Sequence, residues 1–226
     1  MFAVLKKELK SYLLTPIGYI FIGLFLLMFG ILFYGAVYTY RDSHFEYAFY
    51  DAATIITFLI PVLTMRMFAE ERKSGTEQLL LTSPKSLTQV VLGKFFAGVI
   101  IVLLSTLGTL VHFAILNHFT TPDIKVALVT IFGFVLLCCC YLSFGMFISS
   151  ISENQIVASV LTIACFIGMW FLPNVWEGFY NISLMFMYDH FPMGVIDLAE
   201  IVKFVTFAIF FIILTIIVLK RRKSVK

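Results

Sequence analysis

The chain has 226 residues, of which 61% are hydrophobic and 13% are charged, and its formal net charge is +3. A soluble domain carries about 25% charged residues, and a chain of this size would still expose a large share of its surface. The composition therefore excludes a soluble globular protein and indicates one that is surrounded by lipid.

The N-terminal residues 1–14 are predicted to form an amphipathic interface helix. Apolar side chains recur there every three to four positions, and basic side chains occupy the other face. The apolar set is Phe2, Leu5, Leu9, Tyr12 and Leu13, and the basic set is Lys6, Lys7 and Lys10. Such a helix lies flat on a membrane surface. Thr15 is then expected to cap a new helix, with Pro16 at its first position.

Six segments are long and apolar enough to cross a bilayer, which takes about 20 residues each. They are Ile17–Tyr38, Ala52–Phe68, Val90–Leu116, Val126–Ile148, Ile156–Leu172 and Phe204–Leu219. The predicted fold is an all-α membrane protein, in which residues 1–226 form a single domain of six transmembrane helices.

The distribution of Lys and Arg predicts the orientation of these spans. With six spans, only Arg41, Lys125 and Lys203 of the 16 basic residues fall on one side of the membrane. Basic residues concentrate on the cytoplasmic side, so we expect both termini to be cytoplasmic. The predicted location is the inner, cytoplasmic membrane, crossed several times.

The loop after the second span, within Arg66–Lys94, is the most informative stretch. Ser74 and Glu77 have the spacing of a capping box, which predicts a short helix over Thr76–Leu81. Ser83–Pro84 would end that helix and start the next one. Three consecutive leucines in the short helix need a partner surface or the lipid headgroup region. An ordinary charged loop is the alternative.

A second cytoplasmic contact is predicted in the turn between spans four and five. Its residues are short and polar: Ser149, Ser150, Glu153, Asn154 and Gln155. Gly145 lies four residues before Ser149, a spacing that permits close approach of helices. A simple turn with helix packing explains the same residues equally well.

The segment 173–203 is predicted to be an outer re-entrant or interfacial segment. Aromatic residues near its start suit the membrane interface: Trp170, Trp176, Phe179 and Tyr180. Met185, Met187, His190 and Met193 are ligand types that suit copper, but packing by methionine is the favoured explanation, and no metal site is predicted.

His112 is the ionisable side chain that stands out inside a predicted span. Ionisable residues within the membrane are functional candidates by default, so His112 is a candidate pathway residue. A neutral histidine bonded to a neighbouring hydroxyl, such as that of Thr109, is the alternative. Cys138 to Cys140 are consecutive and predict neither a disulfide framework nor a metal site.

Several spaced motifs resemble the ABC-2 type transporter permeases, in particular their gliding-motility (GldF-like) and NosY-like branch. After the second span these are Glu70-Glu71-Arg72, Gly75-Thr76, Leu79-Leu80 and Ser83-Pro84. The stretches Lys6–Ile20, Gly145–Gln155 and Gly194–Leu198 look like further segments of that branch. One departure is Met193, where the branch usually has Arg before the glycine.

This resemblance implies the permease subunit of an ATP-driven exporter, whose residues 69–88 form a segment that couples to separate ATPase subunits. The coupling residues would be Glu70, Glu71, Arg72, Gly75, Thr76, Glu77, Leu79, Leu80, Ser83 and Pro84. The expected partners are ABC ATPase subunits, a second permease subunit (the same or a related chain) and membrane lipid, but no nucleic acid.

The chain lacks the glycine-rich loop that cradles ATP phosphates, so we expect it to bind no cofactor and to be no enzyme. ATP and Mg²⁺ would belong to the partner ATPase. A non-transporting membrane scaffold or a channel subunit is the alternative function.

Overall fold

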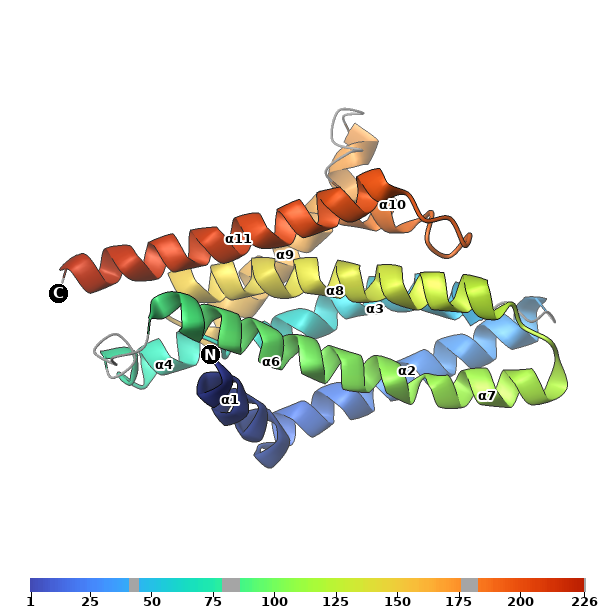
Figure 1. The fold of residues 1–226 in the computed structure, drawn as a ribbon, viewed down its shortest axis with the longest axis horizontal. Coiled ribbons are helices and arrows are strands. Elements are labelled where there is room, and N and C mark those ends of the chain that lie inside the picture. The colour runs from blue at the N-terminus through green and yellow to red at the C-terminus, as the bar shows by residue number, and fades with distance from the viewer. Residues whose placement is uncertain (41–44, 79–85, 176–182, 226) are drawn as a thin grey trace.

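The computed structural model describes residues 1–40, 45–78, 86–175 and 183–225. Within these residues the only regular secondary structure is helical, which confirms the all-α fold (Figure 1). The helices are α1 (Phe2–Leu14), α2 (Pro16–Tyr40), α3 (Phe45–Thr64), α4 (Ala69–Lys73), α6 (Leu87–Gly108), α7 (Leu110–Phe119), α8 (Ile124–Ile151), α9 (Gln155–Val175), α10 (Leu184–Tyr188) and α11 (Leu198–Val225).

Six helical segments are long and apolar enough to cross a membrane, as the sequence predicts. They are Pro16–Tyr38, Phe45–Lys73, Leu87–Phe119, Ile124–Ile151, Gln155–Pro173 and Leu198–Ser224. Two helices are longer than the predicted spans: α3 begins at Phe45 and not at Ala52, and α11 begins at Leu198 and not at Phe204. The apolar runs mark only the membrane core, whereas these helices continue through polar residues such as Glu46 and Glu200.

Helices α3 and α8 form the centre of the bundle. In the most apolar stretch of these two spans, 67% and 56% of the residues are buried, against 17–33% in the other four. Aromatic rings fill the space between α2, α3 and α8. Phe29 lies 4.9 Å from Phe49, and Phe49 lies 5.1 Å from Phe134, measured between ring centroids. Helices α2 and α9 pack against α3, and helices α6, α9 and α11 pack against α8.

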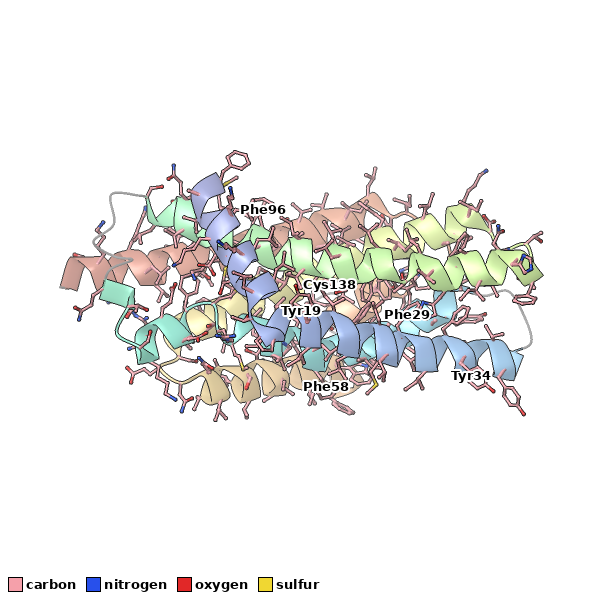
Figure 2. The ribbon with its side chains drawn as sticks, turned by 90° about the horizontal axis from the view of Figure 1, so that it is seen from below. Tyr19, Phe29, Tyr34, Phe58, Phe96 and Cys138 are labelled. Atoms are coloured by element: carbon pink, nitrogen blue, oxygen red, sulfur yellow. The ribbon has the colours of Figure 1, made fainter. Side chains whose placement is uncertain are left out.

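Many large apolar side chains lie on the outside of the bundle, which is typical of a membrane protein. Tyr34 and Phe96 lie on the outside with 70% and 41% of their surface exposed, whereas Phe29 and Cys138 lie within the bundle (Figure 2). A soluble protein would have to cover such faces, so the structure and the composition agree on a lipid environment.

The amphipathic helix α1 packs against α6. A Cβ atom on Gly93 of α6 would lie 2.9 Å from the Val4 side chain, so the two helices touch closely there. The buried Tyr12 hydroxyl donates to the Leu63 carbonyl at 3.3 Å, and burial raises the pKa of Tyr12 well above its usual value. The predicted basic face is confirmed, since Lys6, Lys7 and Lys10 are all exposed.

One detail of the predicted N-terminus is wrong. Phe2 is 78% exposed, and Val4 takes the buried position in the first turn, because the helix meets α6 on that side. Thr15 has an extended backbone, but its hydroxyl donates to the Ser11 carbonyl at 2.8 Å. Thr15 therefore closes α1, and α2 begins at Pro16, as the sequence predicts.

Helix α10 and the turn after it fold back into the bundle. Leu184, Tyr188 and Phe191 are almost fully buried. A Cβ atom on Gly133 of α8 would lie 2.3 Å from the Phe191 ring, so only glycine leaves room for that ring. The interfacial aromatic residues Trp176, Phe179 and Tyr180 lie outside the described residues.

Candidate coupling site

Helices α1, α4 and the C-terminal end of α11 lie toward the same end of the bundle (Figure 1). We call it the α4 end. Most of the basic residues that predict a cytoplasmic location lie in these elements: three in α1, two in α4 and four in α11. The short helix α4 follows α3 at this end. The first predicted coupling residues, Glu70, Glu71 and Arg72, therefore lie in α4 at this end of the bundle.

Ser149 of α8 holds the start of α4. Its hydroxyl accepts from the backbone N–H groups of Phe68 and Ala69 at 3.1 and 3.2 Å, and donates to the Met65 carbonyl at 3.2 Å. The first N–H groups of a helix have no hydrogen-bond acceptor within the helix, and here a side chain from another helix provides that acceptor. One turn earlier, Gly145 brings α8 against Thr64, with room for no Cβ atom. The predicted close approach at this Gly–Ser spacing is confirmed.

A buried lysine joins α4 to α1 and α6. Lys94 of α6 is 2% exposed, and its ammonium group lies 3.1 Å from a Glu8 carboxylate oxygen and 2.9 Å from one of Glu71. It also lies 5.3 Å from the centroid of the Phe68 ring. Burying an ammonium group is costly unless it is paired, so the two carboxylates and the ring offset that cost.

Further ion pairs connect the segment 66–77, which contains α4, with the rest of the α4 end. Within it, Arg66 makes two hydrogen bonds to Glu70. Arg72 pairs with Glu153 in the turn before α9 and also donates to the Ile151 carbonyl at 3.2 Å. We call the ion pairs of Lys94, Arg66, Arg72 and Arg222 the coupling network.

The last of these pairs reaches the C-terminal helix. Glu77 lies beyond the turn after α4, and its carboxylate accepts from Arg222 of α11 at 3.1 Å. Both side chains are largely buried, at 13% and 23% exposure. The coupling network therefore joins this segment to α1, α6, the α8–α9 turn and α11.

The turn after α4 is the most exposed part of the site. Lys73, Ser74, Gly75 and Thr76 are all exposed, and Gly75 has φ +74°, a left-handed conformation that favours glycine. A Cβ atom on Gly75 would meet nothing within 4 Å. Glycine is therefore required by the backbone conformation and not by a neighbour.

The predicted capping box of Ser74 and Glu77 is wrong. Ser74 ends α4 in the right-handed helical conformation, whereas a helix N-cap needs an extended backbone. Its hydroxyl donates to the Glu71 carbonyl at 3.2 Å and lies 2.8 Å from the Thr76 hydroxyl. Glu77 is drawn to Arg222 instead, because a partly buried ion pair holds the carboxylate more strongly than an amide does.

The remaining residues of the predicted second contact lie at the end of α8 and the start of α9. Ser150 is buried and donates to the Phe147 carbonyl, and Asn154 caps α9 by accepting from the Ile156 N–H at 3.0 Å. Gln155 begins α9. These bonds belong to a turn with helix packing, and a second contact with a partner stays a prediction. Leu79, Leu80, Ser83 and Pro84 lie outside the described residues.

His112 of α7 faces α2 and lies among aromatic rings. Its ring centroid lies 5.3 Å from those of Phe29 and Phe33. The expected bond to Thr109 is wrong, because that hydroxyl donates to the Thr106 carbonyl at 2.6 Å. Nδ1 of His112 is buried without a hydrogen-bond partner in the described part of the chain.

Sequence reasoning misses Glu8, Lys94 and Arg222 as members of the site, and treats Lys94 only as a charge that sets the orientation. A usable signal is present, since this single lysine follows Val90 and Val91 and precedes a long apolar run in the same helix. A charge in such surroundings must be paired, but the sequence does not say with which carboxylates.

Comparison with known protein families matches residues 36–219 to the family described as ABC-2 family transporter protein. No curated protein matches the chain. The matched range begins in the last turns of α2 and ends within α11, and it includes the coupling network except for Glu8 and Arg222. It spans well over half of the chain. This chain therefore belongs to the ABC-2 family of transporter membrane proteins.

Proposed function

We propose that this chain is the permease subunit of an ATP-driven exporter in the inner membrane, of the gliding-motility and NosY-like branch. In this proposal the α4 end faces the cytoplasm and residues 69–88 dock onto a separate ATPase subunit, which binds ATP and Mg²⁺. A second permease subunit completes the transporter. Family membership supports the permease role, and the charge distribution supports the orientation.

The observation that carries the proposal is the coupling network. The exposed turn at residues 73–76 lies between Glu71, Arg72 and Glu77, whose ion pairs reach α6, the α8–α9 turn and α11. Lys94 of α6 extends this connection to Glu8 of α1. A movement of an ATPase against that turn would therefore act on four parts of the bundle together. Transport needs such a connection, because ATP binding must shift the balance between two arrangements of the membrane helices.

The test is co-purification of an ATPase subunit with the permease in mild detergent. We expect Gly75→Pro to abolish co-purification and the associated ATPase activity, because proline cannot adopt φ +74° and removes the N–H that donates to the Arg72 carbonyl. Gly75 is exposed, so the bundle itself should stay folded.

Gly75→Asn is the matched control for this experiment. Asparagine tolerates the left-handed conformation, and its side chain would meet no neighbouring atom within 4 Å of Cβ. It should keep most of the bound ATPase. A wild-type chain that is folded yet binds no ATPase would favour the scaffold or channel alternative.

The ion pair between Glu77 and Arg222 gives a second test. Reversing one charge, in Glu77→Arg or Arg222→Glu, should reduce permease-stimulated ATP hydrolysis severalfold, because like charges then meet at a partly buried contact. The double variant restores opposite charges and should recover most of the rate. Equal loss in the single and double variants would show that the pair does not act as a unit.

A further inference from the structure

The exposed face of α1 carries three lysines and no acidic side chain. Lys6, Lys7 and Lys10 are all exposed, and they share one face because Lys6 and Lys7 lie one helical turn before Lys10. Glu8 lies on the other face, where its side chain is 13% exposed and pairs with Lys94. No ion pair among the described residues involves any of the three lysines. This face therefore presents positive charge without a partner in the described part of the chain.

The apolar face of α1 is covered by protein. Val4 and Tyr12 are 9% and 7% exposed, and Leu5, Leu9 and Leu13 pack against the core of the bundle. An amphipathic helix usually binds a membrane by inserting its apolar face among the lipids. Here α6 and α2 pack against α1 and take up that face, so the basic face is the one left for the membrane.

Two close contacts hold α1 at the level where the bundle becomes exposed to lipid. An added Cβ atom on Gly93 of α6 or on Gly18 of α2 would lie 2.9 or 2.3 Å from the nearest atom of α1. Within one turn beyond these contacts, Phe96 and Tyr19 are 41% and 62% exposed. Exposed aromatic rings are typical of the membrane interface. Helix α1 runs across the direction of α2 at this level, which is that of the lipid headgroups (Figure 2).

The basic face leads into an apolar surface at the start of α2. Leu14, one turn after Lys10, is 73% exposed, and Tyr19 and Ile20 in the first turns of α2 are 62% and 57% exposed. A phospholipid has its parts in the same order, with a charged headgroup followed by acyl chains. The phosphate can therefore lie against the lysines while an acyl chain runs along α2.

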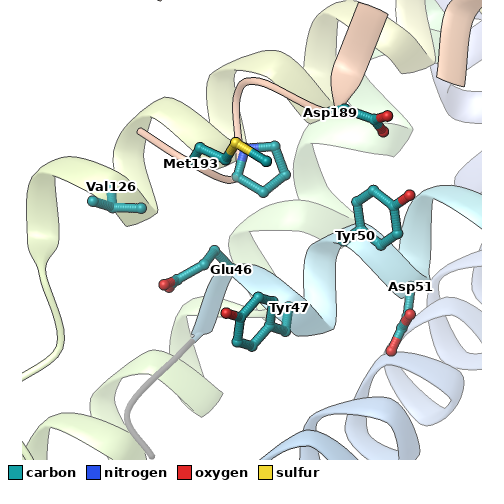
Figure 3. A pocket seen from close by; sticks show the side chains of 8 residues that line it. Glu46, Tyr47, Tyr50, Asp51, Val126, Asp189 and Met193 are labelled. Atoms are coloured by element: carbon teal, nitrogen blue, oxygen red, sulfur yellow. The ribbon is translucent and has the colours of Figure 1, made fainter. Parts of the chain in front are cut away.

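The opposite end of the bundle carries the opposite charge. A cavity of about 620 Å³ opens there, lined by the carboxylates of Glu46, Asp51 and Asp189, and no basic side chain lines it in the described part of the chain (Figure 3). Carboxylates repel an anion, whereas ammonium groups attract one. The charge of the two ends therefore favours an anionic ligand at α1.

We propose that the basic face of α1 binds an anionic phospholipid, with the headgroup phosphate against Lys6, Lys7 and Lys10 and an acyl chain beside Leu14 and Tyr19. An acidic protein surface is the alternative occupant, but the level of α1 and its continuity with the lipid-facing start of α2 favour a lipid. The proposal goes beyond the coupling function, because binding needs no ATPase. Its failure would leave the coupling proposal untouched.

The experiment is native mass spectrometry of the purified full-length chain, titrated with phosphatidylglycerol or with zwitterionic phosphatidylcholine that has the same acyl chains. We expect phosphatidylglycerol to bind at least about tenfold more tightly, because each lysine at an anionic lipid surface strengthens the attraction about fivefold. Glycerophosphoglycerol, which is the same headgroup without acyl chains, should bind at least about tenfold more weakly than the lipid. Replacing the three lysines together, in Lys6→Gln, Lys7→Gln and Lys10→Gln, should remove the preference for phosphatidylglycerol.

The matched control is the triple variant Lys220→Gln, Arg221→Gln and Lys223→Gln. It removes the same charge from exposed positions of α11 at the same end of the bundle, and should keep most of the preference. Thermal unfolding checks that each variant is folded. If the triple α1 variant does not fold, Lys10→Gln decides in its place and should weaken binding about fivefold. Equal binding of the two lipids by the wild type would overturn the proposal, as would a preference that the folded α1 variant keeps or that both triple variants lose equally.

Discussion

Replacing Lys94 with methionine should lower the free energy of unfolding by about 3–5 kcal/mol, which is the cost typical of removing one partner from a buried ion pair. Lys94 is 2% exposed, and its two partners Glu8 and Glu71 are 13% and 18% exposed. Methionine fills a similar volume but leaves two carboxylates facing each other without a cation. Thermal unfolding of the purified chain in detergent measures the loss, and ATPase stimulation should fall with it.

A triple variant separates the charge from the packing. Adding Glu8→Gln and Glu71→Gln to Lys94→Met removes the uncompensated charges, so most of the lost stability should return. The coupling to the ATPase should remain impaired, because α4 is then no longer tied to α1 and α6 by charge. A triple variant as unstable as Lys94→Met would mean that the site depends on the shape of lysine and not on its charge. Lys125→Met, at an exposed position near the start of α8 and away from this site, is the control and should change little.

The membrane architecture could be predicted from the sequence because it depends on local patterns. Runs of about 20 apolar residues mark the six spans. The amphipathic pattern of residues 1–14 also predicts α1 and its exposed lysines correctly. Each of these features depends on neighbours within a few turns of one helix.

The site depends on contacts that no local pattern contains. Lys94 meets Glu8, which is 86 positions away, and Arg222 meets Glu77 across 145 positions. Ser74 and Glu77 have the spacing of a capping box, which is a local pattern. The structure does not form this capping box, because Arg222, which is distant in the sequence, binds Glu77. Ionic partners in a helix bundle are set by how the helices pack, which a single sequence does not fix.

Replacing Gly145 with alanine should destabilise the chain by about 1–3 kcal/mol, although alanine is the better helix former. The added Cβ would lie 2.4 Å from the Thr64 hydroxyl oxygen and 2.9 Å from its Cβ. The Thr64 Cβ atom is fixed by the backbone of a central helix, so no side-chain rotation can move it away. The gain in helix propensity is about 1 kcal/mol, so the clash should outweigh it. Thermal unfolding measures the difference.

The effect of Gly145→Ala should extend to the coupling site, because Ser149 lies one turn further along the same face of α8. If α3 and α8 move apart, the hydrogen bonds from the Phe68 and Ala69 N–H groups to the Ser149 hydroxyl should break. Stimulated ATP hydrolysis should then fall. Gly23→Ala is the matched control, since its added Cβ meets nothing within 4 Å. Thr64→Ala combined with Gly145→Ala removes the closest clashing atom and should restore part of both properties. Full activity in a folded Gly145→Ala chain would show that α4 does not depend on this close contact.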